Sequence, residues 1–309
     1  MKTTILVTGS NGLLGQKIVY KLLQRNDVKL IAASKGDNRL IERNGYTYIN
    51  LDISKLDEVR SAVENFQPQV IINTAAMTNV DECETKREEC WGANVTAVEN
   101  FVTVIQSENI GQRTSDIHFI HLSTDFVFDG EDGPYKEEDQ PNPLSYYALS
   151  KYESEKVLQK SHISWAILRT IIVYGIVDNM SRSNVVLWAK GALEKGQPIN
   201  VVDDQFRSPT LAEDLADACI SAVDKKAKGI YHVSGKDIMS ILELVYRVAD
   251  FWKLDKSIVK PIKSDTLNQA AKRPPRTGFI LDKAYRELDY KPHSFEEGLK
   301  ILDEQLKKV

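Results

Sequence analysis

The chain has 309 residues, of which 42% are hydrophobic and 27% are charged, and its net charge at pH 7 is -4. These values are ordinary for a globular protein with a hydrophobic core. They provide no basic surface for nucleic acid, and no block of like charges is long enough for an interaction tail. We therefore expect a protein that acts on small molecules, with no nucleic acid among its partners.

The apolar run before Thr8 is too short for a signal peptide, and no later run reaches the length of a membrane-spanning helix. We therefore expect a cytoplasmic protein with no membrane partner. The three cysteines, Cys83, Cys90 and Cys219, lack the spacing of a redox motif or a zinc knuckle. They are expected to be reduced and mostly buried. The five histidines form no H-E-x-x-H pattern, so no catalytic metal is expected.

Short β-rich runs alternate with amphipathic helical patterns along the first 175 residues. Apolar strands that are each followed by an amphipathic helix are typical of a parallel sheet covered by helices on both faces. Right-handed crossovers then give an α/β fold with a doubly wound sheet, the Rossmann fold. Strands are expected at 3–9, 28–34, 69–76, 117–124 and 164–175, and helices at 15–26, 55–66, 96–109 and 147–160.

Beyond residue 175 the alternation becomes irregular. A helix at 210–223 and a strand at 229–235 are expected to return to the sheet, and further helices are expected at 241–252 and 295–306. The remaining segments predict a smaller C-terminal region that closes over the strand ends and forms a substrate cleft. The predicted boundaries are 1–175 with 205–235 for the sheet domain, and 176–204 with 236–309 for the smaller substrate-binding region.

Three glycines, Gly9, Gly12 and Gly15, lie between the first strand and the first helix in the stretch TGSNGLLG. Glycine at such a junction indicates a tight turn or a close approach to a ligand. Backbone N–H groups and the positive end of the helix dipole favour a pyrophosphate there, and the position after a first β-strand predicts dinucleotide binding. A turn that needs glycine for steric reasons alone is the alternative. The expected contacts at this turn are Gly9, Ser10, Asn11, Gly12, Leu13, Leu14 and Gly15.

Tyr147 and Lys151 are four residues apart on a predicted helix, so they share a face. An ammonium beside a phenol stabilises the phenolate and lowers the tyrosine pKa, which is useful for acid–base chemistry. Upstream, a predicted strand ends at Ser123 and Thr124, where a hydroxyl can bind a substrate carbonyl. The alternatives are a solvated helix face for the first pair and capping of the strand end for the second.

The second predicted strand ends at Ser34 and Lys35 without a carboxylate, and Arg39 follows in the same loop. In folds selective for NAD, an acidic side chain near this point binds the adenosine ribose. Asp37 is the nearest acid in sequence, and it lies beyond the turn. Two cations here favour the extra phosphate of NADP(H), so we predict that NADPH is preferred about tenfold while NAD(H) stays usable. The alternative is that both cations are simply solvated.

In their order along nearly the whole chain, these motifs resemble the extended short-chain dehydrogenase/reductases, and within them the dTDP-4-dehydrorhamnose reductase family. Three positions depart from many members, because Met77, Phe126 and Ile172 stand where those have an aromatic residue, a tyrosine and a tryptophan. These differences leave the particular sugar and nucleotide open. The matching segments are TGSNGLLG at 8–15, LDI at 51–53, INTAAMTNVDECE at 72–84, LSTDFVFDG at 122–130, LRTIIVYG at 168–175, VVDDQFRSPT at 201–210 and FEEGLK at 295–300.

The resemblance implies an oxidoreductase in which hydride from a nicotinamide reaches the keto carbon of a nucleotide-linked 4-keto-6-deoxysugar. Tyr147 delivers the proton, Thr124 donates a hydrogen bond, and Lys151 assists and holds the nicotinamide ribose. Further cofactor contacts implied by the resemblance are Asp52, Ile53, Ala75, Ala76, Met77 and Asn94. Implied substrate contacts are Val80, Thr124, Asp125, Arg182, Gln205, Arg207 and Arg273, with solvated surface as the alternative for the three arginines.

A second hypothesis comes from another class of protein. The same fold resembles the regulatory subunit of methionine adenosyltransferase, so the chain could bind a dinucleotide without turnover. The intact Thr124, Tyr147 and Lys151 favour the enzyme. A nucleotide-sugar epimerase is a third reading, and dehydration is disfavoured because no glutamate follows Asp125. The oligomeric state stays open, with a homodimer as the assembly considered.

Overall fold

The protein is described here from a computed structural model that covers residues 2–107, 117–179 and 183–308. Its centre is a parallel sheet of seven strands in the order β11-β6-β5-β4-β1-β2-β3. The order reverses direction between β1 and β4, which creates the switch point where ligands bind in such folds. The strands are β1 (Thr3–Thr8), β2 (Val28–Ser34), β3 (Tyr46–Asn50), β4 (Val70–Asn73), β5 (His118–Thr124), β6 (Ser164–Thr170) and β11 (Gly229–His232).

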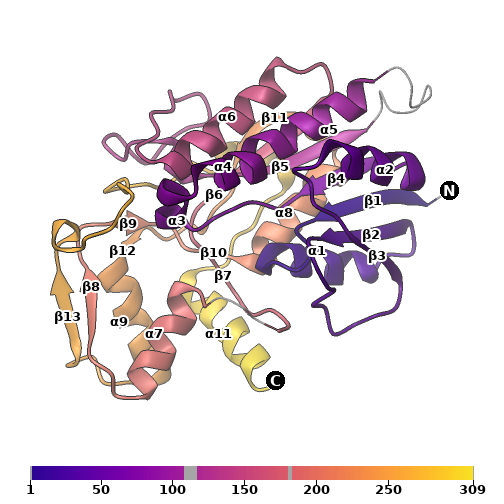
Figure 1. Ribbon diagram of the computed structural model, residues 1–309. Helices are drawn as coiled ribbons and strands as arrows, with labels where there is room; N and C mark the ends of the chain where they lie inside the picture. Colours follow the sequence, from indigo (N-terminus) through magenta and orange to yellow (C-terminus); the bar gives the residue numbers. More distant parts are fainter. Residues whose placement is uncertain (1, 108–116, 180–182, 309) are drawn as a thin grey trace.

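Helices cover both faces of this sheet, as the alternating pattern of the sequence predicts (Figure 1). Neighbouring residues of β1 face opposite sides, so Ile5 and Val7 join one hydrophobic core while Leu6 joins the other. The predicted doubly wound Rossmann fold is therefore confirmed. One face is covered by α1 (Leu13–Leu23), α8 (Ala212–Asp224) and α10 (Asp282–Leu288), and the other by α2 (Leu56–Phe66), α5 (Ala97–Gln106) and α6 (Tyr146–Lys160).

The C-terminal half contains a third hydrophobic core, separate from the two that flank the sheet. Tyr174, Leu193, Val245 and Leu299 are among its buried members. In Figure 1 the helices and strands of this core lie at one end of the molecule, beyond the carboxyl ends of the sheet strands. They are α7 (Val185–Glu194), β8 (Ile199–Val202), α9 (Ile241–Trp252), β13 (Val259–Ile262) and α11 (Phe295–Leu306).

Among the residues described, three short strand pairs lie outside the central sheet. β7 (Val173–Tyr174) pairs with β10 (Thr210–Leu211), β9 (Phe206–Arg207) with β12 (Met239–Ser240), and β13 with β8. On the side of α5 and α6, the chain between β4 and α5 forms α3 (Val80–Thr85), α4 (Arg87–Trp91) and the π-helix η1 (Gly92–Thr96). The remaining single turns are η4 (Asp125–Val127) and η5 (Ser264–Thr266).

Two differences from the predicted elements concern the strands that form the central sheet or leave it. β3 has no counterpart among the predicted strands, because its pattern YTYIN is only half-buried and polar residues alternate through it. The predicted strand at 164–175 is divided into β6 and β7, and between them Ile172 has a φ of 22°, an unusual value for a β-branched residue. The chain therefore bends where it leaves the central sheet toward the C-terminal region. Over the residues described, no helix has the length and apolar content needed to cross a membrane.

Candidate active site

The glycine turn is held so closely against its neighbours that two of its glycines tolerate no side chain. Gly9 has a φ of 71°, and a Cβ there would lie 2.6 Å from the backbone nitrogen of Ala75. A Cβ on Gly15 would lie 2.2 Å from the Gly9 carbonyl oxygen. Gly12 is the N-cap of α1, and no side chain caps the helix there. The first N–H groups of α1 therefore remain available to an anionic ligand.

Two cavities meet at this turn, and Gly12, Thr74 and Ala76 line both of them. The first has a volume of about 470 Å³ and extends from α1 to α6. The second has a volume of about 680 Å³ and extends over the ends of β2 and β3. A pair of adjoining cavities with unpaired helix N–H groups between them suits a dinucleotide whose pyrophosphate lies at the turn.

The second cavity contains an ion pair at the ends of β2 and β3. Lys35 Nζ lies 2.9 Å from Asp52 Oδ2, and the Ser54 hydroxyl donates to Asp52 Oδ1 at 2.6 Å. Burial alone would raise the pKa of Asp52, but the hydrogen bonds from Ser54 and Lys35 bring it below its ordinary value. The sequence places no carboxylate at the end of β2, but the expectation that none lies near this point is wrong. The neighbouring strand β3 leads to the carboxylate of Asp52, because Ser34 pairs with Asn50, two residues before Asp52.

Other predicted cofactor residues form hydrogen bonds that hold the glycine turn against β2 and the loop after it. The Asn11 backbone N–H donates to Ser34 Oγ at 2.9 Å, and the Asn11 side chain accepts from the Arg39 backbone N–H at 2.9 Å. Ser10 is fully buried, and its backbone N–H donates to the carbonyl of Ala33. These contacts tie the turn to the loop after β2. Neither Ser10, Asn11 nor Arg39 lines a cavity, whereas Ser34 lines the second one.

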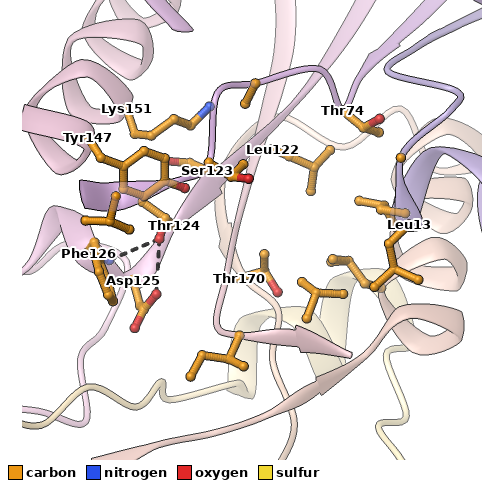
Figure 2. A pocket seen from close by; sticks show the side chains of 18 of the residues that line it. Leu13, Thr74, Leu122, Ser123, Thr124, Asp125, Phe126, Tyr147, Lys151 and Thr170 are labelled. Carbon is orange, nitrogen blue, oxygen red and sulfur yellow. Dashed lines mark hydrogen bonds between the residues drawn. The ribbon is translucent and has the colours of Figure 1, made fainter. Parts of the chain in front are cut away.

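The three predicted catalytic side chains line the first cavity together. Thr124 ends β5, while Tyr147 and Lys151 lie on α6, whose N-cap Ser145 accepts from the Ala148 N–H at 3.3 Å. Figure 2 shows them on one side of the cavity, with Leu13 from the start of α1 on the other. The structure thus brings the three predicted catalytic residues to the side of the glycine turn.

The hydroxyl of Thr124 is fixed by two hydrogen bonds. Thr124 Oγ1 accepts from the Phe126 N–H at 3.2 Å and donates to Asp125 Oδ1 at 3.1 Å (Figure 2). Ser123 also lines the cavity, and its buried Oγ has no hydrogen-bond partner among the residues described. Both hydroxyls considered at the end of this strand therefore lie in the cavity wall, one held and one without a partner.

Burial dominates the protonation of the acid–base pair. It raises the pKa of Tyr147 above its ordinary value, although a hydrogen bond with Thr124 opposes the shift. Burial also lowers the pKa of Lys151 to about 8. The predicted lowering of the Tyr147 pKa is therefore wrong for the protein alone. The reason is that the site removes water from both groups, and a desolvated phenol keeps its proton.

Three of the predicted substrate contacts, Val80, Thr124 and Asp125, line the first cavity. Phe126 and Ile172, the departures from the family pattern, line it too, and Met77 lines the second cavity. Asp125 is buried, and this burial raises its pKa although Arg207 and the hydroxyl of Thr277 oppose the shift.

The other predicted substrate contacts do not reach either cavity. Arg207 is buried, with Nη2 donating to the Pro274 carbonyl at 2.6 Å and Nε 3.8 Å from Asp125. Arg273 donates to both carboxylate oxygens of Asp81, at 3.1 and 2.5 Å. Gln205 is buried, and its carbonyl accepts from the Ile241 N–H. Arg182 lies outside the residues that the structure describes.

Asn94, from the π-helix η1, lines neither cavity and instead forms hydrogen bonds with the loop after β4. Its Oδ1 accepts from the Met77 N–H at 2.8 Å, and its Nδ2 donates to the Met77 carbonyl at 3.1 Å and to Ser150 Oγ at 2.9 Å. This amide therefore fixes the course of Met77 beside α6. Of the remaining predicted cofactor contacts, Gly12, Leu13, Leu14 and Gly15 line the first cavity, and Gly9, Gly12, Lys35, Asp52, Ile53, Ala75, Ala76 and Met77 line the second.

Several cavity residues are absent from the predicted set. Thr74 follows the end of β4, and the strand-end argument that singled out Thr124 could have found it. Glu88 and Glu89 enter the second cavity from α4, and no pattern in the sequence indicated them. The others are Thr78, Leu122, Thr170, Val173 and Leu215 in the first cavity, and Thr8, Ala33, Leu51, Ser54, Gly92 and Ala93 in the second. The described residues contain no group of three or more His, Cys, Asp or Glu side chains arranged to hold a metal ion.

A doubly wound parallel sheet, a glycine turn after its first strand and a Thr–Tyr–Lys set across the cavity define the class of the extended short-chain dehydrogenase/reductases. Within that class, the family model described as the RmlD substrate binding domain matches residues 1–307. The chain belongs to this family.

Relatives in sequence fall into more than one kind. Methionine adenosyltransferase 2 subunit beta of Danio rerio is 30% identical over 275 residues, which cover 87% of this chain and 80% of that protein. The spore coat polysaccharide biosynthesis protein SpsK of Bacillus subtilis (strain 168) is 30% identical over 301 residues, which cover 96% of each. Sequence similarity therefore extends both to a subunit of another enzyme and to a protein of polysaccharide biosynthesis.

Among solved structures, a dTDP-4-dehydrorhamnose reductase of Clostridium acetobutylicum ATCC 824 has a TM-score of 0.84 and 27% identity, covering 99% of this chain and all of that one. The dTDP-4-dehydrorhamnose reductase of Bacillus anthracis str. Ames, in complex with NADP, has a TM-score of 0.82 and 27% identity, with the same coverage. The likeness to these reductases thus extends over the sheet and the C-terminal region alike.

Proposed function

We propose that this chain reduces the 4-keto group of a nucleotide-linked 6-deoxysugar at the expense of NADPH, as a dTDP-4-dehydrorhamnose reductase does. One observation carries the proposal: Thr124, Tyr147 and Lys151 line a single cavity that adjoins the glycine turn. A protein that only binds a dinucleotide has no chemical need for an acid–base pair at this point. The reductase structures that resemble the chain over its whole length support the same reading.

When bound, the dinucleotide supplies the hydride, and the residues of the chain supply the proton and the positioning. Tyr147 keeps its proton in the buried site, since burial raises its pKa, and it can give that proton to the oxygen of the reduced carbonyl. With a pKa of about 8, Lys151 is mostly charged at pH 7 and stabilises the tyrosinate left behind. Thr124 can donate to the substrate oxygen beside Tyr147 once its hydroxyl turns from Asp125.

The first cavity has an apolar wall that includes two of the departures from the family pattern. Val80, Phe126 and Ile172 contribute to it. We propose that this wall contacts the carbon skeleton and methyl group of the deoxysugar, while Asp125 and the hydroxyls at the strand end face its polar groups. We propose that Arg207 and Arg273 bind the diphosphate of the nucleotide. Arg273 would then have to exchange its present partner Asp81 for the phosphate.

For the cofactor we propose a preference for NADPH over NADH. The main support for this preference is Lys35. Its side chain is 80% exposed and lies at the end of β2, where an adenosine 2′-phosphate would compete with Asp52 for the lysine. Arg39 follows in the same loop. The division into a dinucleotide-binding domain and a substrate-binding region, the homodimer and the cytoplasmic location stay predictions from the sequence.

A second candidate function is supported by the curated relatives. Proteins named methionine adenosyltransferase 2 subunit beta are 30% identical to the chain, so a regulatory subunit that binds a dinucleotide is the alternative. Such a subunit would bind NADPH with no turnover, and it would associate with the catalytic chain of that transferase.

Turnover on a defined panel separates the two functions. The purified chain is incubated with NADPH and a series of nucleotide-linked 4-keto-6-deoxysugars, and the absorbance of the reduced cofactor is followed. The reductase predicts consumption of NADPH with at least one sugar. NADPH binding without consumption on any sugar, together with co-elution with a methionine adenosyltransferase catalytic chain, would favour the regulatory subunit.

A further inference from the structure

The catalytic lysine has a buried neighbour that neither cavity contains. His121 lies on β5, three residues before Thr124, and only 1% of its surface is exposed. Its Nε2 lies 3.2 Å from Lys151 Nζ and 3.0 Å from Ser154 Oγ. Ser154 in turn donates to the backbone carbonyl of Lys151 at 2.6 Å. His121 therefore contacts the head of the lysine directly and its backbone through Ser154.

On its other side, His121 continues a row of polar side chains across three neighbouring strands. Its Nδ1 lies 3.2 Å from Asn73 Nδ2 on β4, and Asn73 Oδ1 accepts from the Thr8 hydroxyl on β1 at 2.6 Å. Thr8 pairs with Asn73, and Asn73 pairs with His121, in the register of the sheet. The row thus joins the residue that precedes Gly9 in the dinucleotide turn to the lysine on α6.

Such a row is costly inside a parallel sheet unless each polar group has a partner. Among the described residues, no other side chain lies within hydrogen-bond distance of Lys151 Nζ. Around His121 the charged or titratable groups are Lys151 and, through it, Glu155 and Cys90 on α6 and α4. Burial and the charge of Lys151 lower the pKa of His121 well below its ordinary value, so the imidazole is neutral. A neutral imidazole has one acceptor nitrogen, so Nε2 accepts from the Lys151 ammonium in the tautomer that carries the ring proton on Nδ1. In that tautomer the Asn73 amide turns its oxygen toward Nδ1 and its NH2 toward Thr8 Oγ1.

We propose that His121 is a positioning residue, which fixes Lys151 Nζ in the cavity wall and couples it through Asn73 and Thr8 to the strand that carries the dinucleotide turn. The proposal rests on the proposed function to the extent that Lys151 holds the nicotinamide ribose. In this proposal, the row of Thr8, Asn73 and His121 fixes the position of Lys151 relative to the glycine turn, so that both ends of the dinucleotide site stay correctly placed.

Two amide substitutions separate positioning from mere space filling. In His121→Asn the short amide can still meet Asn73 but cannot reach Lys151. In His121→Gln the longer amide reaches the place of Nε2 and can still contact the lysine. Both keep a neutral polar group of similar size in the core, so they form a matched pair.

The affinity for NADPH, measured by fluorescence titration, and the turnover on the best sugar of the panel are the readouts. We expect His121→Asn to weaken NADPH binding and lower turnover about tenfold, and His121→Gln to stay within about threefold of the wild type. In a Lys151→Met background, His121→Asn should have no further effect on NADPH affinity, because the group that it positions is gone. Melting temperatures of the pair establish that both variants are folded.

Equal losses in the Asn and Gln variants would overturn the proposal, and so would an effect of His121→Asn that persists in the Lys151→Met background. If His121→Asn does not fold, Asn73→Ser applies the same test from the other side of the row. A wild type that consumes no NADPH, but shows the expected affinity pattern, keeps the positioning role and contradicts the reductase. A wild type that binds neither NADPH nor NADH contradicts both.

Discussion

The two sides of the candidate site differ in how their residues are held. On the cofactor side, backbone contacts fix the site: Gly9 and Gly15 pack so closely that a Cβ would meet another residue's backbone. On the substrate side, side chains from distant segments hold one another, as Asp81 holds Arg273 and Asp125 faces Arg207. The first arrangement leaves no room for a further atom, so we expect it to stay rigid with or without a ligand. The second has to exchange partners before an arginine can meet a diphosphate, so it is the side on which specificity can change.

The largest expected effect lies where the two sides meet, at the proton donor. Tyr147→Phe should lower turnover by roughly two to four orders of magnitude, because a positioned acid is lost. NADPH affinity should stay nearly unchanged, since the phenyl ring keeps the packing. Tyr146→Phe is the matched control, because Tyr146 precedes it on α6, contacts Arg87 and lines neither cavity. Turnover of the Tyr147→Phe variant within a factor of a few of the control would contradict the assignment.

The rigidity of the cofactor side is tested by adding one methyl group. Gly15→Ala places a Cβ 2.2 Å from the Gly9 carbonyl oxygen, so the free energy of unfolding should fall by about 1–3 kcal/mol and NADPH binding should weaken. Gly191→Ala, on α7 of the C-terminal region, meets nothing within 4 Å and should raise stability by about 0.5–1 kcal/mol. Urea unfolding of both variants measures the contrast. Similar effects of the two substitutions would show that the turn is not the rigid element.

The proposed preference for NADPH is tested by removing the two cations after β2. In the Lys35→Ala, Arg39→Ala double variant, the preference for NADPH over NADH should fall by about tenfold, the effect of one charge-assisted contact. Lys29→Ala, at an exposed position of β2 outside both cavities, is the control. The ratio of the kcat/KM values for the two cofactors is measured in each protein. A wild type that prefers NADH, or a double variant with unchanged discrimination, would refute the proposed preference.

The smallest expected effect is a dependence of cofactor affinity on pH. The pKa of Lys151 is about 8, below its ordinary value, so its ammonium is lost as the pH rises through this range. The NADPH dissociation constant should therefore increase severalfold between pH 7 and 9, and Lys151→Met should abolish this change. Titrations at a series of pH values measure it. A wild-type profile that matches that of Lys151→Met would show that the lysine charge takes no part in binding.

The sequence predicts the cofactor side better than the substrate side for a physical reason. Glycine spacing, the end of a buried strand and a four-residue interval on a helix are local features, and they placed Gly12, Thr124, Tyr147 and Lys151 on cavity walls. The surroundings of Arg207 and Arg273 depend on contacts between segments that are far apart in the sequence. Their partners, the Pro274 carbonyl and Asp81, have no pattern that relates them in the sequence.

Two further errors come from packing in three dimensions. The carboxylate near the end of β2 comes from Asp52, and only the pairing of β2 with β3, a strand without a clear apolar pattern, brings it there. The lowered pKa expected for Tyr147 from its lysine neighbour is reversed by burial. Sequence spacing reveals which charges are near, but it does not reveal how much water remains around them.

The proposed transfer of hydride from the nicotinamide to a sugar carbonyl inside the first cavity is tested most directly with an isotope label. NADPH carrying deuterium at the transferred position of the nicotinamide is incubated with the wild type and the best nucleotide-linked 4-keto-6-deoxysugar, and the product is analysed by mass spectrometry. We predict a reduced sugar that contains one deuterium, and a strongly reduced yield with Tyr147→Phe. A sugar that is recovered unreduced and unlabelled across the whole panel, from a protein that binds NADPH, would contradict the account.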